Sequence, residues 1–423
     1  MSSFWTDTAH ETIADAARWL PAAQAVVVGA GFTGLAAAYY LARQGATVMV
    51  LEQETVGFGA SGRNGGQVLS GWPLDMTTIV ARFGQDAAEM LWSVSEEALA
   101  RVKAMVRNEA IHCDLTPTGH LEATASSREV GTLIKELAVL QSLSTRSFEF
   151  WEEARISERT GAVGYQAGIF DPAPMAFHPV NYGLGLARAG MRHGVRLYPH
   201  TRVTGIAATG LGKFDVSTSR GKVRAAQVLL CTNGYVPRFA RWLRARILPV
   251  YSAQIAVTVA EQTQLPRQMP TVSASAPSYQ YFRRVGARNF LFGGRLEREH
   301  VARGDLRGLL RQLEERIPAL AGARLSHQWT GRIAISSDFM PHLARLKNGV
   351  WVAGGYTGHG AALSTEMGWL LARAVLSGEM DPRIRLLSSL PWRRFPLSAG
   401  HTVLSPERGL RLLNKSQRRL LRT

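Results

Sequence analysis

One stretch near the N-terminus limits the choice of fold more than any other. Residues 26–28 form a β-branched run, and Gly29, Gly31 and Gly34 follow it with the spacing G-x-G-x-x-G. Apolar residues then recur at helical spacing as far as Gly45. A buried strand, a tight turn and a helix in this order are typical of a dinucleotide-binding βαβ unit, whose helix N-terminus faces a pyrophosphate.

An acidic residue follows this unit at the distance that the motif requires. Glu52 ends the next apolar run, where a carboxylate accepts hydrogen bonds from a ribose hydroxyl group. Gln53 and Glu54 come next, and this acidic segment disfavours the 2′-phosphate of NADP. The alternative is an ordinary glycine-rich turn without a ligand. A second G-x-G-x-x-G, in residues 57–62, has no strand before it and is not interpreted as a site.

The bulk composition is that of a folded enzyme. Of the 423 residues, 46% are hydrophobic and 19% are charged, and the length predicts two domains. The two cysteines, Cys113 and Cys231, predict buried thiols in a reducing compartment and no disulfide framework. The first twenty residues or so lack the basic and apolar regions of a signal peptide, and no segment is expected to span a membrane. We therefore expect a cytoplasmic protein.

The formal net charge of +17 allows three kinds of partner: an acidic substrate, a nucleic acid or an anionic membrane. Much of the charge lies in a basic C-terminal tail, residues 379–423, where leucines and arginines are expected on opposite faces of a helix. Such a helix can bind peripherally to the inner face of a membrane, although a solvated helix face is the simpler interpretation. Nucleic acid is disfavoured because the basic residues lack interleaved aromatic residues.

Four motifs together resemble one family. VVVGAGFTGL with Glu52, GASGRNGG, CTNGY and GGYTGHG resemble the D-amino-acid oxidase / glycine oxidase superfamily of FAD-dependent oxidoreductases. GASGRNGG and the N-terminal SFWTDTA are similar to the gamma-glutamylputrescine oxidase-like branch of that superfamily. The resemblance extends over residues 4–377.

The resemblance implies an α/β protein (α+β overall) with a Rossmann-like FAD-binding domain interleaved with a mainly antiparallel-sheet substrate domain. The alternation of αβ blocks with blocks richer in antiparallel strand favours the same organisation. The FAD-binding segments are predicted at residues 1–90, 161–246 and 331–378. The substrate-domain segments are predicted at residues 91–160 and 247–330.

The cofactor implied by the resemblance is FAD in an extended pose, with the isoalloxazine at the domain interface. Carried over by motif, the residues expected to contact it are Gly29, Ala30, Gly31, Phe32, Thr33, Gly34, Glu52, Gln53, Ser61, Gly62, Arg63, Asn64, Gly65, Gly66, Gln67, Val203, Thr232, Asn233, Gly234, Gly354, Gly355, Tyr356, Thr357, Gly358, His359 and Gly360.

The last motif has a physical meaning of its own. Residues 350–353 predict a strand, residues 354–360 a glycine loop, and residues from 361 onward a helix. A helix N-terminus aimed at the pyrimidine edge of the flavin stabilises the negative charge of the reduced form. The alternative is a strand–helix turn whose glycines serve packing alone.

Substrate contacts are expected from the second domain and the last loop. In strand-like stretches there is an alternation of Tyr251, Tyr279, Tyr281 and Arg283, so some of them are expected to share a face, where an arginine can pair with a substrate carboxylate. The alternative places Tyr281 and Arg283 on a solvated sheet face. The eleven histidines form no zinc-binding motif, so no metal is expected. The residues predicted to act on the substrate are Tyr251, Tyr281, Arg283, Arg295, Arg332 and His359.

Such enzymes transfer a hydride from a carbon next to an amine nitrogen to flavin N5, and the imine product then hydrolyses. The substrate implied is gamma-glutamylputrescine-like or another carboxylated amine, such as an N-substituted or cyclic amino acid. Residues 289–295 contain no lysine, which some oxidases place near the flavin. A membrane-associated dehydrogenase that passes electrons to a quinone or carrier is therefore an alternative to an oxidase that uses oxygen. An FAD-dependent tRNA-modifying protein and a non-catalytic flavoprotein are further alternatives.

Overall fold

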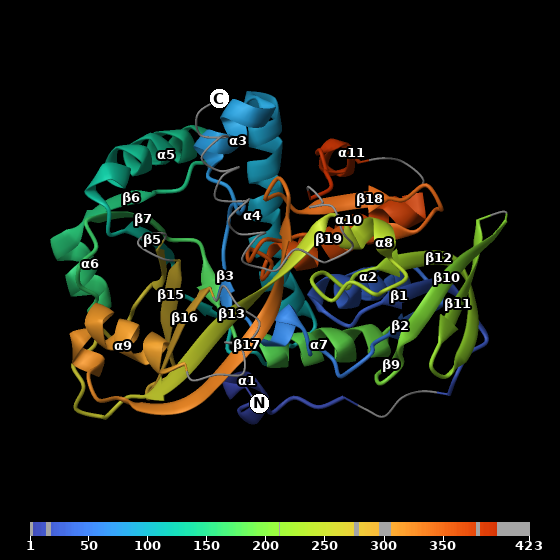
Figure 1. The fold of residues 1–423 in the computed structure, drawn as a ribbon, viewed down its shortest axis with the longest axis horizontal. Helices are drawn as coiled ribbons and strands as arrows, with labels where there is room; N and C mark the ends of the chain where they lie inside the picture. Colours follow the sequence, from blue (N-terminus) through green and yellow to red (C-terminus); the bar gives the residue numbers. More distant parts are fainter. Residues whose placement is uncertain are drawn as a thin grey trace.

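The computed structural model describes residues 3–13, 18–210, 212–274, 279–295, 306–377 and 381–395. Two large sheets lie side by side, the first on the right and the second on the left of Figure 1. The helices of this part of the chain are α1 (Phe4–Asp7), α2 (Phe32–Arg43), α3 (Met76–Phe83), α4 (Gln85–Asn108), α5 (Val130–Leu143), α6 (Glu153–Thr160), α7 (Pro179–Arg192), α8 (Arg241–Arg244), α9 (Arg307–Arg316), α10 (Leu363–Ser377) and α11 (Pro382–Ser389).

The first sheet has a parallel centre. Its strands are β1 (Ala22–Val28), β2 (Val48–Leu51), β9 (Arg196–Tyr198), β10 (Val203–Gly210), β11 (Lys213–Thr218), β12 (Gly221–Leu230), β18 (His342–Arg345) and β19 (Trp351–Gly354). Strand β1 pairs in parallel with β12 and β2, and Val28 lies level with Leu230 and Leu51. The three strands therefore end at the same edge of the sheet, where ligands bind in sheets of this kind.

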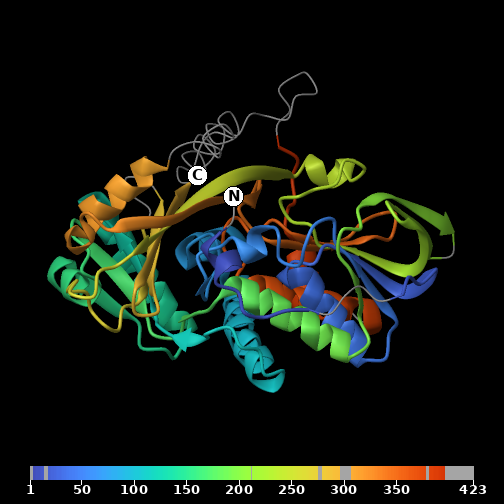
Figure 2. The same ribbon diagram turned by 90° about the horizontal axis from the view of Figure 1, so that it is seen from below.

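Helices cover one face of this sheet. Helix α2 packs against both α7 and α10 (Figure 2). Gly368 allows the close approach of α10, because a Cβ atom there would lie 2.5 Å from the backbone oxygen of Thr33 and 2.7 Å from the Cβ of Ala36. The buried side chains of β1 and α2 form one continuous apolar core with those of α4, α7 and α10.

The second sheet has eight strands in the order β17-β13-β16-β15-β14-β5-β7-β6. They are β5 (His120–Thr124), β6 (Glu149–Glu152), β7 (Ala167–Asp171), β13 (Ile247–Thr258), β14 (Thr271–Ala274), β15 (Gln280–Val285), β16 (Asn289–Arg295) and β17 (Arg324–Ser336). All neighbours are antiparallel except β14 and β5. A small third sheet joins β3 (Gln67–Val68), β8 (Met175–Ala176) and β4 (Thr116–Pro117).

The predicted segment boundaries differ from the observed elements at three places. Residue 90 falls inside the continuous helix α4, and residue 330 falls inside β17. Strand β7 follows the predicted boundary at residue 160, yet it pairs with β5 and β6 in the second sheet. Long elements run through boundaries that local composition suggests, because tertiary pairing decides which sheet a strand joins. The interleaved division into two domains stays a prediction.

The stretch from Met76 to Asn108 forms two helices and not one. Gly84 ends α3 and begins α4 with a φ of 85°, a conformation that favours glycine. Apolar spacing continues across the break, so periodicity alone does not reveal it. The break lets α3 turn towards α5, whose Glu136 accepts hydrogen bonds from the backbone N–H groups of Met76 and Thr77.

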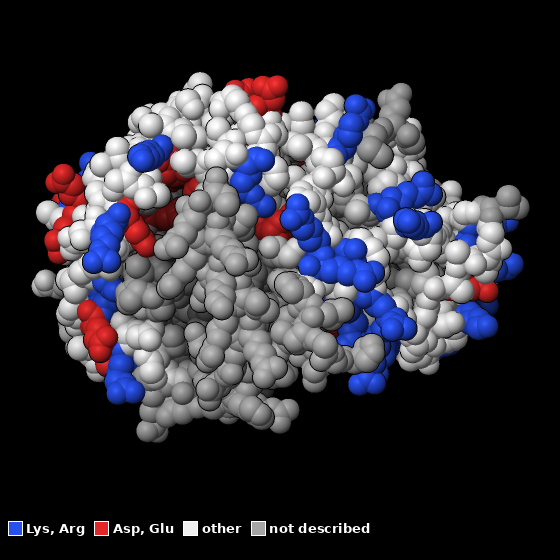
Figure 3. All heavy atoms as spheres, turned by 45° about the horizontal axis from the view of Figure 1, so that its top comes forward, with Lys and Arg blue, Asp and Glu red and all other residues white. Residues whose placement is uncertain are grey.

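Basic side chains are unevenly distributed over the face of the molecule that Figure 3 shows. Figure 3 shows Lys and Arg gathered on the half that holds the first sheet, and most of the Asp and Glu on the other half. Within the described ranges, no helix combines the length and apolarity needed to cross a membrane. The predicted membrane-binding helix of the basic tail lies mostly in residues 396–423, outside the described residues.

Candidate functional site

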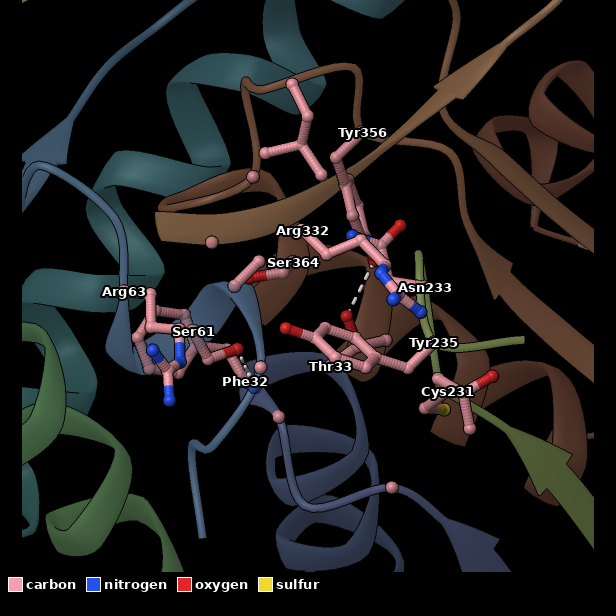
Figure 4. A pocket seen from close by; sticks show the side chains of 18 of the residues that line it. Phe32, Thr33, Ser61, Arg63, Cys231, Asn233, Tyr235, Arg332, Tyr356 and Ser364 are labelled. Atoms are coloured by element: carbon pink, nitrogen blue, oxygen red, sulfur yellow. Dashed lines mark hydrogen bonds between the residues drawn. The ribbon is translucent and has the colours of Figure 1, made fainter. Parts of the chain in front are cut away.

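A cavity of about 770 Å³ lies between the two sheets. The start of α2, the loop after β2, the turn after β12 and the loop before α10 all contribute to its lining. Side chains from β13, β15 and β17 line it from the second sheet. Figure 4 shows Thr33, Ser61, Asn233 and Tyr356 around this space. Segments that are far apart in the sequence thus form one site at the edge predicted from the parallel strands.

The glycine-rich turn has the geometry that its spacing predicts. Gly29 has a φ of 104°, and a Cβ atom there would lie 2.8 Å from the backbone oxygen of Cys231. A Cβ at Gly34 would lie 2.0 Å from the backbone oxygen of Gly29, so only glycine lets α2 pack this closely against β1. Gly31 and Thr33 line the cavity at the N-terminus of α2, where backbone N–H groups attract anions.

Glu52 lines the cavity next to this turn. One carboxylate oxygen accepts the Ala30 N–H at 2.7 Å, and the other accepts the Glu54 N–H at 2.9 Å. Burial raises the pKa of Glu52, and these two backbone hydrogen bonds oppose the rise. Each carboxylate oxygen has a second lone pair, so the group keeps the capacity to accept hydrogen bonds from a ribose.

Residues 60–67 form a loop that is held from both sides. Ser61 Oγ accepts the Phe32 N–H at 3.0 Å, as Figure 4 shows. The Trp5 indole N–H donates to the backbone oxygen of Asn64 at 2.8 Å. Trp329 and Gln254 both donate to the backbone oxygen of Arg63. The buried N-terminal helix α1 and the second sheet therefore position this loop along the cavity.

The loop before α10 is fixed by three contacts. Tyr356 shares a hydrogen bond of 2.7 Å with the Thr33 hydroxyl group, and Asn233 accepts the Gly355 N–H at 3.0 Å. His359 Nε2 lies 2.8 Å from the backbone oxygen of Ser70, and it must donate because a carbonyl only accepts. Burial lowers the pKa of His359 to about 4, so its imidazole is neutral at pH 7. Helix α10 begins at Leu363, two residues later than predicted.

Tyrosines and one arginine approach from the second sheet. The Tyr281 hydroxyl group lies 3.1 Å from Ser252 Oγ, and its ring centroid is 5.9 Å from that of Tyr279. The Arg332 guanidinium lies over the Tyr235 ring at 5.1 Å and the Tyr251 ring at 5.2 Å. Arg332 also donates to the Tyr251 hydroxyl group at 2.5 Å. Tyr251 does not line the cavity itself but supports Arg332.

Most of the residues predicted for the cofactor meet at this cavity. Those that line it are Gly29, Gly31, Phe32, Thr33, Glu52, Gln53, Ser61, Arg63, Asn64, Gly65, Gln67, Val203, Thr232, Asn233, Tyr356, Thr357, Gly358, His359 and Gly360. Ala30, Gly34, Gly62, Gly66, Gly234, Gly354 and Gly355 are not among the lining residues, and several of them are close-packed glycines. Their roles towards a cofactor stay predictions.

The structure corrects the interpretation of Arg283. It is only 6% exposed and does not line the cavity. Its guanidinium donates to the backbone oxygen of Phe177 at 2.8 Å and lies 5.1 Å from the Trp5 ring. Burial lowers its pKa to about 9. Arg283 and Tyr281 do share a face of β15, but the loop over Gly65 and Gly66 covers that face, so it is not solvated.

Two further predictions have different outcomes. The backbone of Arg295 ends β16, but its side chain lies outside what the structure describes. Tyr281, Arg332 and His359 do line the cavity.

The motifs did not identify several lining residues that reach the site from neighbouring segments. These are Phe58, Thr201, Arg202, Tyr235, Phe239, Gln254 and Ser364, of which Tyr235 alone carried a signal, as the last letter of CTNGY.

The residues present fit FAD. The lining of the cavity includes Glu52 and Val203 from the side of the first sheet and Tyr281 from β15 of the second sheet, so one space connects the two sheets. Glycines leave room for phosphates beside the α2 N-terminus, since a Cβ at Gly31 would already lie 3.0 Å from Ser61 Oγ. Thr232 and Ser364 line the cavity, and their hydroxyl oxygens are buried without a hydrogen-bond partner among the described residues.

Known proteins similar to this chain were found both by sequence and by fold, and those found include oxidoreductases and an oxidase. The model of the DAO family, FAD dependent oxidoreductase, matches residues 24–374. "Probable oxidoreductase OrdL" of Haemophilus influenzae is 29% identical over 87% of this chain and 86% of that protein. "Gamma-glutamylputrescine oxidoreductase" of Escherichia coli is 28% identical over 90% and 89%. The structure of glycine oxidase from Geobacillus kaustophilus covers 89% of this chain, with all of that chain aligned, a TM-score of 0.73 and 19% identity.

Proposed function

The chain belongs to the DAO family of FAD-dependent oxidoreductases, and we propose that it oxidises the C–N bond of an amine or an amino acid. A hydride leaves the carbon next to the nitrogen, a proton leaves the nitrogen, and the resulting imine hydrolyses in water to a carbonyl compound and an amine. Gamma-glutamylputrescine is a candidate substrate because the relative from Escherichia coli carries its name.

One observation carries this proposal. The cavity joins a glycine-rich dinucleotide cradle to a wall of tyrosines and an arginine from the other sheet. A cofactor in the cradle thereby faces a separate surface that can hold a small molecule, as sites between two units do.

FAD, when bound, supplies the two-electron acceptor for this chemistry. The chain itself supplies position and charge. Ala361, Ala362 and Ser364 line the cavity at the start of α10, so the positive end of that helix dipole faces the space where negative charge develops. Arg63 and Arg332 add positive charge to the lining. His359 stays neutral and fixes the loop by donating to Ser70.

The proposal is tested by anaerobic bleaching of the flavin absorption band. The panel contains gamma-glutamylputrescine, N-methyl amino acids, proline, pipecolate and D-amino acids. We expect one class of amine to bleach the band, and the rate at which air restores it distinguishes an oxidase from a dehydrogenase. A flavin-loaded protein that no amine reduces would contradict the proposed oxidation.

A further inference from the structure

A second, smaller cavity of about 170 Å³ adjoins the large one. The two share the lining residues Leu69, Tyr279, Thr357, Gly358 and His359. The smaller cavity extends from there between the second sheet and helices α4 and α5, where Trp92 and Glu136 line it. These shared residues make the two cavities direct neighbours, with His359 at their junction. We call the smaller space the acidic cavity.

The acidic cavity carries the opposite charge to the chain as a whole. Four carboxyl-bearing residues line it, namely Asp75, Glu122, Glu136 and Asp171. Among its described lining residues there is no lysine or arginine. The large cavity differs, because Arg63, Arg202, Arg238 and Arg332 line it. A net charge of +17 thus coexists with a compartment lined by four carboxyl groups beside the proposed reaction site.

Three of the four carboxylates have structural partners. Asp75 caps α3 by accepting the Thr78 N–H at 2.6 Å. Glu136 accepts the Met76 and Thr77 N–H groups at 2.7 and 2.8 Å. Asp171 accepts from Ser70 Oγ at 2.5 Å and from Arg146 at 3.1 Å. These groups have roles in the fold that do not need a ligand.

Glu122 is different. It lies on β5 between β14 and β7, in the interior of the sheet. The Glu122 side chain is exposed to the open space of the acidic cavity, and burial by the surrounding protein raises its pKa to about 7, with repulsion from Glu136 and Asp75 adding to the rise. Among the described residues, its carboxylate makes no hydrogen bond and no ion pair.

The neighbouring histidines do not supply the missing positive charge. Both ring nitrogens of His120 are engaged, with the hydroxyl groups of Thr271 and Ser273 at 2.8 Å each. Burial lowers the pKa of His120 to about 3 and that of His359 to about 4. Both rings are neutral at pH 7, so neither histidine balances the negative charge that Glu122 carries when it is ionised.

We propose that the acidic cavity binds a second, non-reacting ammonium group of the substrate, with Glu122 as its counter-charge. This inference rests on the proposed amine oxidation, since it places the reacting C–N bond in the large cavity and the distal cation beyond His359. The substrate class is then a diamine or a polyamine derivative. A substrate whose far end carries a carboxylate and no ammonium group is disfavoured.

The residues that line the acidic cavity suit an alkylammonium group. Trp72, Trp92, Phe148 and Tyr279 line the cavity and can cover the methylene groups of an alkyl chain. A cavity of about 150 Å³ is large enough for benzene, so this volume accommodates a short alkylammonium group. The ligand would replace repulsion between carboxylates with a charge-assisted hydrogen bond.

The test compares three four-carbon ligands that differ in the charge of the far end: 1,4-diaminobutane, 1-aminobutane and 4-aminobutanoate. Each is titrated anaerobically into the FAD-loaded protein. A shift of the oxidised flavin spectrum reports binding, and loss of the oxidised band reports oxidation of the amine. We expect 1,4-diaminobutane to bind at least about tenfold more tightly than 1-aminobutane, and 4-aminobutanoate to bind most weakly.

Glu122→Gln should abolish the preference for the diamine while leaving the affinity for 1-aminobutane nearly unchanged. Glu122→Asp keeps the charge and should retain part of the preference, which guards against a folding defect in the glutamine variant. Glu89→Gln, at an exposed carboxylate on α4, is the matched control and should bind all three ligands as the unmodified chain does.

Two failures are distinguishable in this experiment. Equal binding of the diamine and the monoamine, or a preference that survives in Glu122→Gln, would overturn the acidic cavity as a cation site even if amines reduce the flavin. Selective binding of the diamine with no reduction by any amine would overturn the proposed oxidation and leave the cation site supported.

Discussion

Single side chains outside the lining of the cavity hold the loops that form it. Trp5 is fully buried in α1 and donates to the backbone oxygen of Asn64. Trp5→Phe keeps an aromatic side chain, although a smaller one, but leaves that carbonyl without its partner, at a cost of about 1–2 kcal/mol. We expect the dissociation constant of FAD to rise about 5- to 30-fold, measured by titration of the apoprotein. Trp242→Phe, at an exposed tryptophan, is the control. An unchanged FAD affinity would show that α1 does not hold the loop.

Glu122 also makes a prediction about stability. Its folded-state pKa of about 7 exceeds the usual 4.5, so its favourable contribution is complete below pH 4.5 and is lost as the pH rises through about 7. Glu136, Asp75 and Asp171 face it together with the neutral His120 and His359. Glu122→Gln cannot ionise, and its Tm relative to the unmodified chain should be higher at about pH 8 than at about pH 5. The comparison uses thermal melts of the FAD-loaded proteins. A difference that is independent of pH, as expected for Glu89→Gln, would mean that Glu122 titrates normally.

Packing between elements depends on one glycine of α10. Gly368 lies against the backbone of α2 at Thr33, next to the cofactor cradle. Gly368→Val should force α10 away from α2 and destabilise the fold by about 1–3 kcal/mol, with weaker FAD binding as a second effect. Gly131→Val in α5 is the control, because an added Cβ there meets nothing within 4 Å. Thermal melts of both variants measure the two changes in Tm. Equal changes of Tm in the two variants would contradict a specific role for the contact between α10 and α2.

At the scale of the whole molecule, the cavity joins elements of both sheets. FAD that spans it should stabilise the fold by about 4 kcal/mol at a concentration 1000 times its dissociation constant. We expect removal of FAD to lower the Tm, and ADP at the same concentration to restore less of it, because ADP fills the adenosine end alone. Differential scanning calorimetry of the apoprotein with each ligand measures this. A shift with ADP as large as that with FAD would place the isoalloxazine outside the cavity.

The sequence by itself determined the features that depend on local backbone geometry. The turn at Gly29 needs a positive φ, and Gly34 needs the absence of a side chain, so their spacing predicts the cradle directly. The position of Glu52 at a strand end and the glycine loop of residues 354–360 follow from the same kind of local requirement. The family, the cofactor and the fold class could be predicted from these motifs and are confirmed.

The tertiary structure alone decided which alternating side chains face the cavity and what lies behind them. Tyr281 and Arg283 share a strand face, yet the loop above them leaves Tyr281 at the cavity and buries Arg283 against Trp5. The acidic cavity unites carboxylates from α5, β5, β7 and the cap of α3, which no motif connects. Burial and charge repulsion arise from contacts between segments that are distant in the chain. The raised pKa of Glu122 and the grouping of carboxylates around its cavity therefore appear only when the chain is folded.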